Sequence, residues 1–110
     1  MSIPTFGIQV VRNGKSTSIS PSGELDIATT PALEQAITEA TAEPGAALVL
    51  DLRELTFMDS TGLRTLAQTN ARADDDGFTL SIVRGSRQIE RVLEISGLGA
   101  LLPLVDAPPE

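Results

Sequence analysis

The chain has 110 residues, of which 41% are hydrophobic, so it is large enough for one domain with a modest core and too small for two. It contains no Trp, Tyr, Cys or His, which excludes disulfides, thiolate metal sites and histidine-based catalysis and leaves a core of mainly aliphatic side chains. Its formal net charge of −7, with only 8 Lys and Arg residues, argues against a nucleic acid partner.

Signals for export and for membrane insertion are missing from the sequence. No stretch approaches the roughly 20 consecutive apolar residues of a membrane-spanning helix. Residues 1–4 lack the basic and apolar regions of a signal peptide. We therefore expect one cytoplasmic domain over residues 1–110, with its core at about 6–105 and a frayed tail at 106–110.

Hydrophobic periodicity and turn residues predict an α/β fold, a mixed sheet packed with helices, in the order β-β-α-β-α-β-α-β. The approximate ranges of these elements, in chain order, are 6–11, 15–22, 31–42, 46–50, 60–73, 78–83, 87–96 and 101–105. Asn13-Gly14 favours a tight type I′ turn, so the first two strands form an antiparallel hairpin. Pro21 lies in the second strand although it cannot donate to a β-ladder.

The helix boundaries carry their own signals. Thr30 is the expected N-cap of the first helix, with Pro31 in its first turn. Ser86 is the expected N-cap of the third helix, which Gly97 ends. The core side chains expected from the second helix and from the C-terminal region are Leu63, Leu66, Ala67, Ala71, Leu98, Leu101 and Leu102.

The element order contains two overlapping β-α-β units. Right-handed crossovers make the second, third and fourth strands parallel. Their carboxyl ends then lie at one rim of the sheet, where α/β proteins usually place their binding sites. The loops expected to share this rim are 23–29, 56–61 and 84–86.

The most unusual segment is Asp59-Ser60-Thr61-Gly62, which stands at the predicted start of the second helix behind an exposed Phe57-Met58 pair. One interpretation is an N-cap, since these side chains accept hydrogen bonds from free amides and Gly62 allows close packing. Capping accounts for one such residue, however, and not for three in a row. The other interpretation is a modification switch, because a phosphate on a hydroxyl there meets the positive end of the helix dipole.

A wider pattern resembles a known family. Phe57-Met58-Asp59-Ser60-Thr61-Gly62-Leu63, preceded by Gly23-Glu24-Leu25-Asp26 and followed by Ser96-Gly97-Leu98, is similar to the STAS family, and within it to the anti-sigma factor antagonists. The resemblance extends from residue 6 to about residue 105 and implies a single STAS-like domain. In that family the hydroxyl directly after the Asp is phosphorylated by a partner anti-sigma factor that is also a serine kinase, and a phosphatase resets it.

The resemblance implies roles for particular residues. It places the phosphoacceptor on Ser60, with Asp59, Thr61 and Gly62 as its neighbours at the switch. The unphosphorylated form is expected to bind the anti-sigma factor and free its sigma factor, and the phosphorylated form to release it. The partner-contacting residues it implies are Gly23, Glu24, Leu25, Asp26, Phe57 and Met58.

Two features depart from the family pattern. Pro21 stands where family members usually have an apolar residue, so a bulge is expected in the second strand. No further C-terminal helix follows Val105, whereas many members carry one.

Two acidic segments can each be interpreted as a functional site or as a solvated turn or loop. Gly23–Asp26 is either a partner contact beside Ser60 or a turn whose carboxylates are simply solvated. Asp74–Asp76 could suggest a metal site, but acidic loops are more often solvated, and we predict no metal site. We also expect no cofactor, because ATP belongs to the partner kinase.

The predicted function is an anti-sigma factor antagonist, a binding protein and not an enzyme, that phosphorylation at Ser60 switches off. An alternative is a non-phosphorylated STAS subunit of a membrane transport or lipid-trafficking assembly. A hydrolase with Ser60 as its nucleophile is a third interpretation, which the lack of a base active at neutral pH disfavours.

Overall fold

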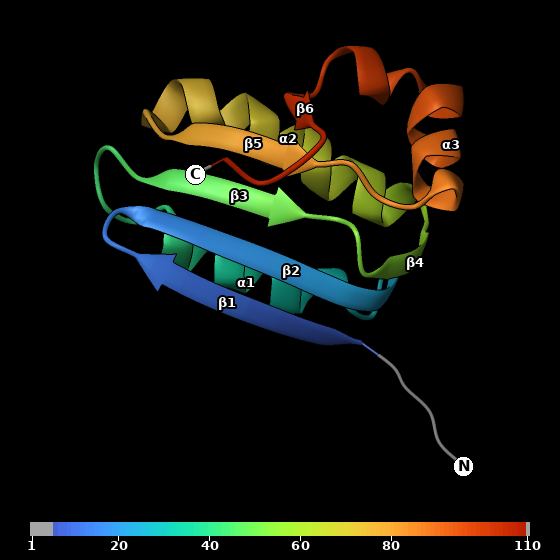
Figure 1. The fold of residues 1–110 in the computed structure, drawn as a ribbon, viewed down its shortest axis with the longest axis horizontal. Helices are drawn as coiled ribbons and strands as arrows, with labels where there is room; N and C mark the ends of the chain where they lie inside the picture. The colour runs from blue at the N-terminus through green and yellow to red at the C-terminus, as the bar shows by residue number, and fades with distance from the viewer. Residues whose placement is uncertain (1–5, 110) are drawn as a thin grey trace.

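The computed structural model describes residues 6–109, and Figure 1 shows how their helices and strands are arranged. Residues 1–4 and Glu110, which the export and tail predictions include, lie outside the described residues. Within residues 6–109, no helix is long and apolar enough to cross a membrane. In chain order the elements are β1 (Gly7–Asn13), β2 (Ser16–Leu25), α1 (Thr30–Ala40), β3 (Ala47–Asp51), β4 (Leu55–Met58), α2 (Ser60–Asp76), β5 (Thr79–Val83), α3 (Arg87–Ser96), the 3₁₀ turn η1 (Leu98–Ala100) and β6 (Leu104–Val105).

The strands form one sheet in the order β1-β2-β3-β5-β6, and β4 pairs with β2 outside this path. β1 is antiparallel to β2, whereas the pairings β2–β3, β2–β4, β3–β5 and β5–β6 are parallel. The predicted α/β class, the hairpin and the three parallel strands are therefore confirmed. Helices α1 and α2 cover one face of the sheet, and α3 lies at its end near β4 (Figure 1).

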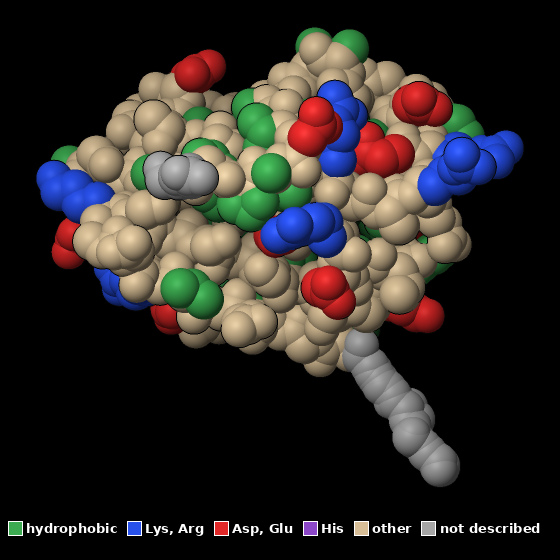
Figure 2. Space-filling model, in the orientation of Figure 1, with side chains coloured by type: hydrophobic (Ala, Val, Ile, Leu, Met, Phe, Trp, Pro, Cys, Tyr) green, Lys and Arg blue, Asp and Glu red, His purple; other side chains and the backbone are tan. Residues whose placement is uncertain are grey.

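The opposite face of the sheet, seen in Figure 2, is not covered by a helix within residues 6–109. Acidic and basic side chains are scattered over it around a small band of hydrophobic atoms (Figure 2). The C-terminal segment 106–109 crosses this face, and Asp106 pairs with Arg84 at 3.1 Å. We call it the helix-free face.

The structure differs from the prediction at the carboxyl end of β2. This strand continues to Leu25, so Gly23 and Glu24 lie in a strand and not in a loop. Residues 55–58 form β4, which was expected to be part of a loop, and they pair with residues 23–25. A strand of four residues is too short to show an alternating pattern, and its pairing with β2 is what holds it extended.

Pro21 fits into β2 because it lies between the residues that pair with β3 and those that pair with β4. β2 pairs with β3 through residues 16–19 and with β4 from Gly23 onwards, so Pro21 faces neither strand. The amide of Gly23 donates to the carbonyl of Glu54, and alternation along the strand directs the nitrogen of Pro21 to that same side. The missing N–H therefore costs no ladder bond. Pro21 pairs in regular register with Ile8, and the irregularity lies between Gly23 and Glu24, so the bulge predicted at Pro21 is wrong.

Two local signals lie one residue from their predicted positions. The hairpin turn is centred on Gly14-Lys15, with Gly14 at a positive φ of 66° and Asn13 paired with Ser16. The N-cap of α1 is Thr29, and Thr30 is buried as the first helical residue. Ser86 does cap α3, because its hydroxyl accepts from the amide of Ile89, and Gly97 ends that helix in the left-handed region, as predicted.

The core lies between the sheet and the helices. The largest side chains that are almost fully buried there are Ile19, Leu25, Leu33, Ile37, Leu48, Leu50, Leu52, Leu55, Leu66, Ile82, Ile89 and Leu93. Helix α2 turns Thr65 and Thr69 inward, and their hydroxyls donate to the carbonyls one turn earlier, so their burial leaves no polar group unpaired. Ala71 and Leu101 are exposed, so their predicted places in the core are wrong.

An ion pair orders the turn that leads from β3 into β4. The guanidinium of Arg53 donates to both carboxylate oxygens of Asp51, the shortest contact being 2.7 Å, and the amide of Arg53 donates to the same carboxylate at 3.1 Å. The hydrogen bond from the Arg53 side chain holds the pKa of Asp51 below its ordinary value, although burial acts in the opposite direction. This turn directs the chain towards β2, with which β4 then pairs.

Replacing Arg53 with Met should lower the free energy of unfolding at neutral pH, because the largely buried carboxylate of Asp51 loses its charged partner. Since the pKa of Asp51 is lowered in the folded state, the stabilisation is full above the unfolded value of about 3.9. It is lost as the pH falls through the folded-state pKa. Urea unfolding of wild type and variant at a series of pH values should therefore show their stabilities converging in acid.

A matched control for this comparison is Asp76→Asn, which breaks the solvent-exposed pair between Arg72 and Asp76. It should change the stability by less than about 0.5 kcal/mol at every pH. A gap between wild type and Arg53→Met that stays constant into strong acid would contradict the role assigned to Asp51.

Candidate functional site

The candidate site is a rim formed by the carboxyl ends of β2 and β4 and the first turn of α2, at the right of Figure 1. Glu24 pairs with Phe57 and Leu25 with Met58 along the two strands. The amide of Asp59 then donates to the carbonyl of Leu25 at 3.2 Å. This pairing places the segment that enters α2 directly beside the loop that leaves β2.

Asp59 is the N-cap of α2. Its backbone is extended, and its carboxylate oxygen Oδ1 accepts from the amides of Thr61 at 2.9 Å and Gly62 at 3.2 Å. The capping interpretation is thus confirmed for Asp59 and not for its neighbours. Ser60 is the first residue of α2 and is exposed, so its hydroxyl is available for other chemistry.

Gly62 lets the first turn of α2 approach the sheet. A Cβ atom on Gly62 would lie 2.6 Å from Cγ of Met58 and 3.0 Å from Cδ2 of Leu25, which is closer than side-chain atoms pack. The positions of Asp59 and Ser60 over the ends of the strands therefore depend on the missing side chain. This agrees with the predicted close packing at Gly62.

The loop between β2 and α1 is held by its own side chains. The carboxylate of Asp26 accepts from the amides of Ala28 and Thr29, and the Thr29 hydroxyl donates to the carbonyl of Glu24 at 2.8 Å. Asp26 therefore organises the turn through backbone hydrogen bonds, so its carboxylate is not simply solvated. The Glu24 side chain is exposed beside it.

Exposure divides the predicted partner-contacting residues into two groups. Leu25 and Met58 are buried, so the predicted exposure of Met58 is wrong, and neither side chain faces solvent at the rim. The physical reason is strand alternation, which turns these two side chains into the core and their neighbours Glu24 and Phe57 outward. Phe57 is 42% exposed.

One exposed apolar residue of the rim was not among the predicted contacts. Ile27, in the loop after β2, is 76% exposed, which is high for a large aliphatic side chain. The signal that points to it is an Ile inside a turn of polar and small residues, Asp26-Ile27-Ala28-Thr29. The third predicted loop, 84–86, lies against the β3–β4 turn, since a Cβ on Gly85 would be 2.9 Å from the carbonyl oxygen of Leu52.

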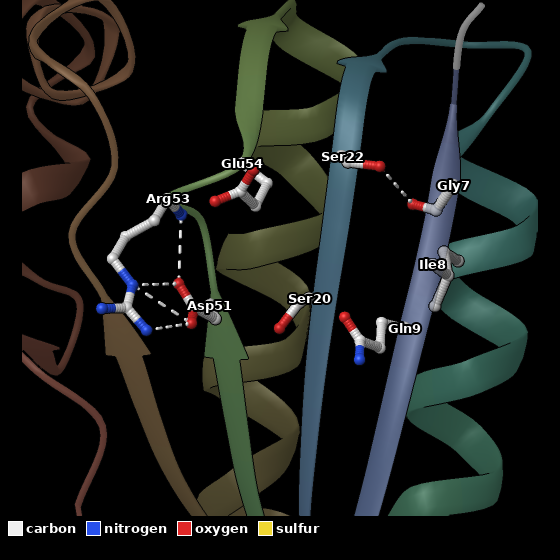
Figure 3. Close-up of a pocket in the computed structure, with 8 residues that line it drawn as sticks. All are labelled: Gly7, Ile8, Gln9, Ser20, Ser22, Asp51, Arg53 and Glu54. Atoms are coloured by element: carbon white, nitrogen blue, oxygen red, sulfur yellow. Dashed lines mark hydrogen bonds and ion pairs between the residues drawn. The ribbon is translucent and has the colours of Figure 1, made fainter.

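A separate hollow of about 680 Å³ lies on the helix-free face, where β2 leaves β3 (Figure 3). It is lined by Gly7, Ile8, Gln9, Ser20, Ser22, Asp51, Arg53 and Glu54. The charged groups of Asp51 and Arg53 at its wall already bind each other (Figure 3). Because Ser60 does not line it, this hollow is not part of the candidate site.

Replacing Asp59 with Ala should lower the stability by about 1–2 kcal/mol, because the first turn of α2 loses an N-cap that accepts two backbone hydrogen bonds. For a domain of this size that corresponds to a decrease of several degrees in Tm, measurable by calorimetry. Asp59→Asn keeps the accepting oxygen and serves as the control, with a Tm close to that of the wild type. An Ala variant that melts like the wild type would contradict the cap.

Comparisons with known proteins find relatives of this chain in both sequence and structure. The family model described as "Mlab, STAS domain" matches residues 8–105. The anti-sigma-B factor antagonist of Staphylococcus aureus is 30% identical over 97 residues, which cover 88% of this chain and 90% of that protein. The crystal structure of an anti-sigma factor antagonist from Mycobacterium paratuberculosis has a TM-score of 0.78 and 33% identity, covering 97% of this chain and 92% of that one.

A further solved protein, the anti-sigma factor antagonist SpoIIAA, is known in two forms. The unphosphorylated form has a TM-score of 0.77 at 21% identity, covering 93% of this chain and 89% of that one. The phosphorylated form from Bacillus has a TM-score of 0.68 at 22% identity, covering 94% and 92%. At these identities the likeness shows a shared fold. The family match over nearly all of the described residues confirms the resemblance found in the sequence: the chain belongs to the STAS domain family.

Proposed function

We propose that this chain is an anti-sigma factor antagonist, which binds an anti-sigma factor through the rim and is switched off by phosphorylation of Ser60. The observation that carries the proposal is the division of roles at the start of α2. Asp59 caps the helix, while the next residue, Ser60, presents a hydroxyl to solvent at the same helix end. A hydroxyl that the fold does not need for capping is free to be modified.

The names of similar proteins support the partner class. The Staphylococcus aureus and Mycobacterium paratuberculosis relatives are both named as antagonists of anti-sigma factors, and each matches this chain along most of its length. SpoIIAA, which shares the fold, exists in unphosphorylated and phosphorylated forms. A regulatory protein of this kind binds its partner and catalyses no reaction, so Ser60 is assigned no catalytic role.

The fold of this chain is expected to tolerate a phosphate on Ser60. The group would sit at the N-terminus of α2, a helix of 17 residues, where the dipole favours a negative charge by about 0.3–1 kcal/mol at an exposed site. Asp59 beside it opposes part of this gain by repulsion. Because Ser60 is exposed, the phosphate also displaces no packed side chain.

Binding of a partner is expected to be far more sensitive than folding. The exposed apolar side chains Phe57 and Ile27 lie on the segments that flank Ser60, and a partner covering them would also cover its hydroxyl. A phosphate adds roughly −1.5 to −2 charges beside Asp59 and Glu24. Burying that charge against a partner costs much more than burying a neutral hydroxyl.

The switch requires two further proteins, which act on Ser60 from outside the chain. A serine kinase activity in the anti-sigma factor would add the phosphate, with ATP bound to the kinase and no cofactor in this chain. A phosphatase would remove it and restore binding. We place all three in the cytoplasm, the compartment in which sigma factors meet RNA polymerase.

Incubation with ATP and the kinase captured from a lysate of the source organism should add one phosphate to the wild-type chain and none to Ser60→Ala. Mass spectrometry of the intact protein and of its peptides measures this. Ser86→Ala is the matched control, since Ser86 also stands at a helix N-terminus but supplies the cap there, and it should leave the phosphorylation unchanged. A phosphate mapped to Thr56 or Thr61 would contradict the assignment.

Phosphorylation, or the Ser60→Asp substitution to a lesser degree, should weaken binding to the anti-sigma factor by roughly 30-fold to several thousand-fold, the range expected for an unpaired buried charge. Ser60→Ala should bind within a few-fold of the wild type, because it removes only a neutral hydroxyl. Calorimetric titration of each form against one anti-sigma factor measures the change, and thermal melting checks that each form is folded. Equal affinities of the Ala and phosphorylated forms would overturn the switch.

The alternative function, a non-phosphorylated subunit of a membrane transport or lipid-trafficking assembly, predicts the opposite outcome of these experiments. In that case the protein captured from the lysate would belong to the assembly. Incubation with ATP would then add no phosphate to Ser60 and would not change the affinity for the captured protein.

A further inference from the structure

Strand β1 is a long open edge of the sheet. It stands at the end of the strand order, runs for seven residues from Gly7 to Asn13, and pairs on one side with β2. Within residues 6–109, no strand pairs with its other side. The strand at the opposite end of the sheet, β6, has only two residues. A very short edge strand offers few backbone groups to another chain, which is one usual protection against edge pairing. β1 lacks this protection.

The hairpin determines which backbone groups of β1 face outward. Its two-residue turn makes Asn13 and Ser16 a hydrogen-bonded pair, and pairs along an antiparallel ladder alternate between bonded and non-bonded. The residues of β1 whose N–H and C=O groups therefore point away from β2 are Ile8, Val10 and Arg12. The pairing of Ile8 with Pro21, which has no N–H, agrees with this assignment.

The side chains of β1 do not protect this edge. The strand contains no proline, and none of the 15 acidic residues of the chain lies in it; its one charge is Arg12. Val10 and Val11 at its centre are 48% and 55% exposed. In a chain with a net charge of −7, this edge is a surface on which two copies can meet without bringing carboxylates on their edge strands together.

We propose that β1 is a self-association edge, along which a second copy of this chain adds its own β1 as an antiparallel strand. In the symmetric register Val10 lies opposite Val10 of the second copy, and Ile8 lies opposite Arg12 of the second copy. These are the residues whose backbone groups face outward, so each pair exchanges both hydrogen bonds. No two like charges face each other, and the aliphatic stem of Arg12 covers the partly buried Ile8.

The same geometry keeps the rim accessible in the dimer. β4 pairs with the edge of β2 that faces away from β1, and α2 follows β4 directly. The second copy therefore lies on the far side of β2 from Ser60. The dimer presents two separate rims, one on each copy, joined through a continuous sheet.

Sedimentation velocity over a wide concentration range tests the proposal with the full chain. The wild type should shift reversibly from the 11.5 kDa monomer towards twice that mass as the concentration rises. Val10→Lys and Val10→Glu should each weaken the dimer by about tenfold or more, because two like charges then face each other at its centre. An equal mixture of the Lys and Glu variants should associate again, because the facing charges are now opposite.

Two further variants distinguish association through β1 from association through a different surface of the domain. Ile95→Lys places the same charge on an apolar residue of α3 that is more exposed than Val10 (78% against 48%), and this variant should dimerise like the wild type. Val10→Pro removes only an outward-facing N–H, so it should abolish the dimer while circular dichroism shows a folded domain. A wild type that stays monomeric at every concentration, a dimer that survives Val10→Lys, or a mixture that fails to associate would each overturn the proposal.

Discussion

The first turn of α2 packs on the ends of β2 and β4 more closely than a side chain at Gly62 would allow, since its Cβ would lie 2.6 Å from Cγ of Met58. This contact places the N-terminus of α2, the positive end of its dipole, at the rim of the sheet. Asp59 can cap α2 while its own amide donates to the carbonyl of Leu25, so one residue belongs to both the strand ends and the helix start. The exposed position of Ser60 follows from this arrangement.

The contact exists because β2 changes its neighbour part of the way along its length. β3 ends at Asp51, the ion pair with Arg53 orders the turn that follows, and β4 then pairs with the last residues of β2. Pro21 occupies the interval in which β2 has no neighbour on that side. A residue that would weaken an ordinary central strand is thus placed where its missing N–H has no consequence.

The three consecutive polar residues at the start of α2 take part in different interactions. Asp59 provides the cap with its carboxylate, and Ser60 presents its hydroxyl to solvent. The amide of Thr61 donates to Asp59, and its carbonyl accepts from Thr65 one turn later. We therefore expect a negative charge added to Ser60 to meet a helix end that favours it and a neighbouring carboxylate that does not. On this proposal the fold changes little, and the main effect falls on a partner that covers the rim.

Local sequence patterns were enough to predict most elements, the hairpin, the cap at Ser86 and the cluster at Asp59–Gly62, because these depend on local periodicity and on residues that bond to their near neighbours. The remaining features depend on contacts between segments that are distant in the chain. β4 is a strand only because β2 offers it free backbone groups, and Leu25 and Met58 are buried only because that pairing and α2 cover them. Likewise α2 turns Thr65 and Thr69 inward instead of Ala71, because the face of a helix that is buried depends on the surface against which it packs.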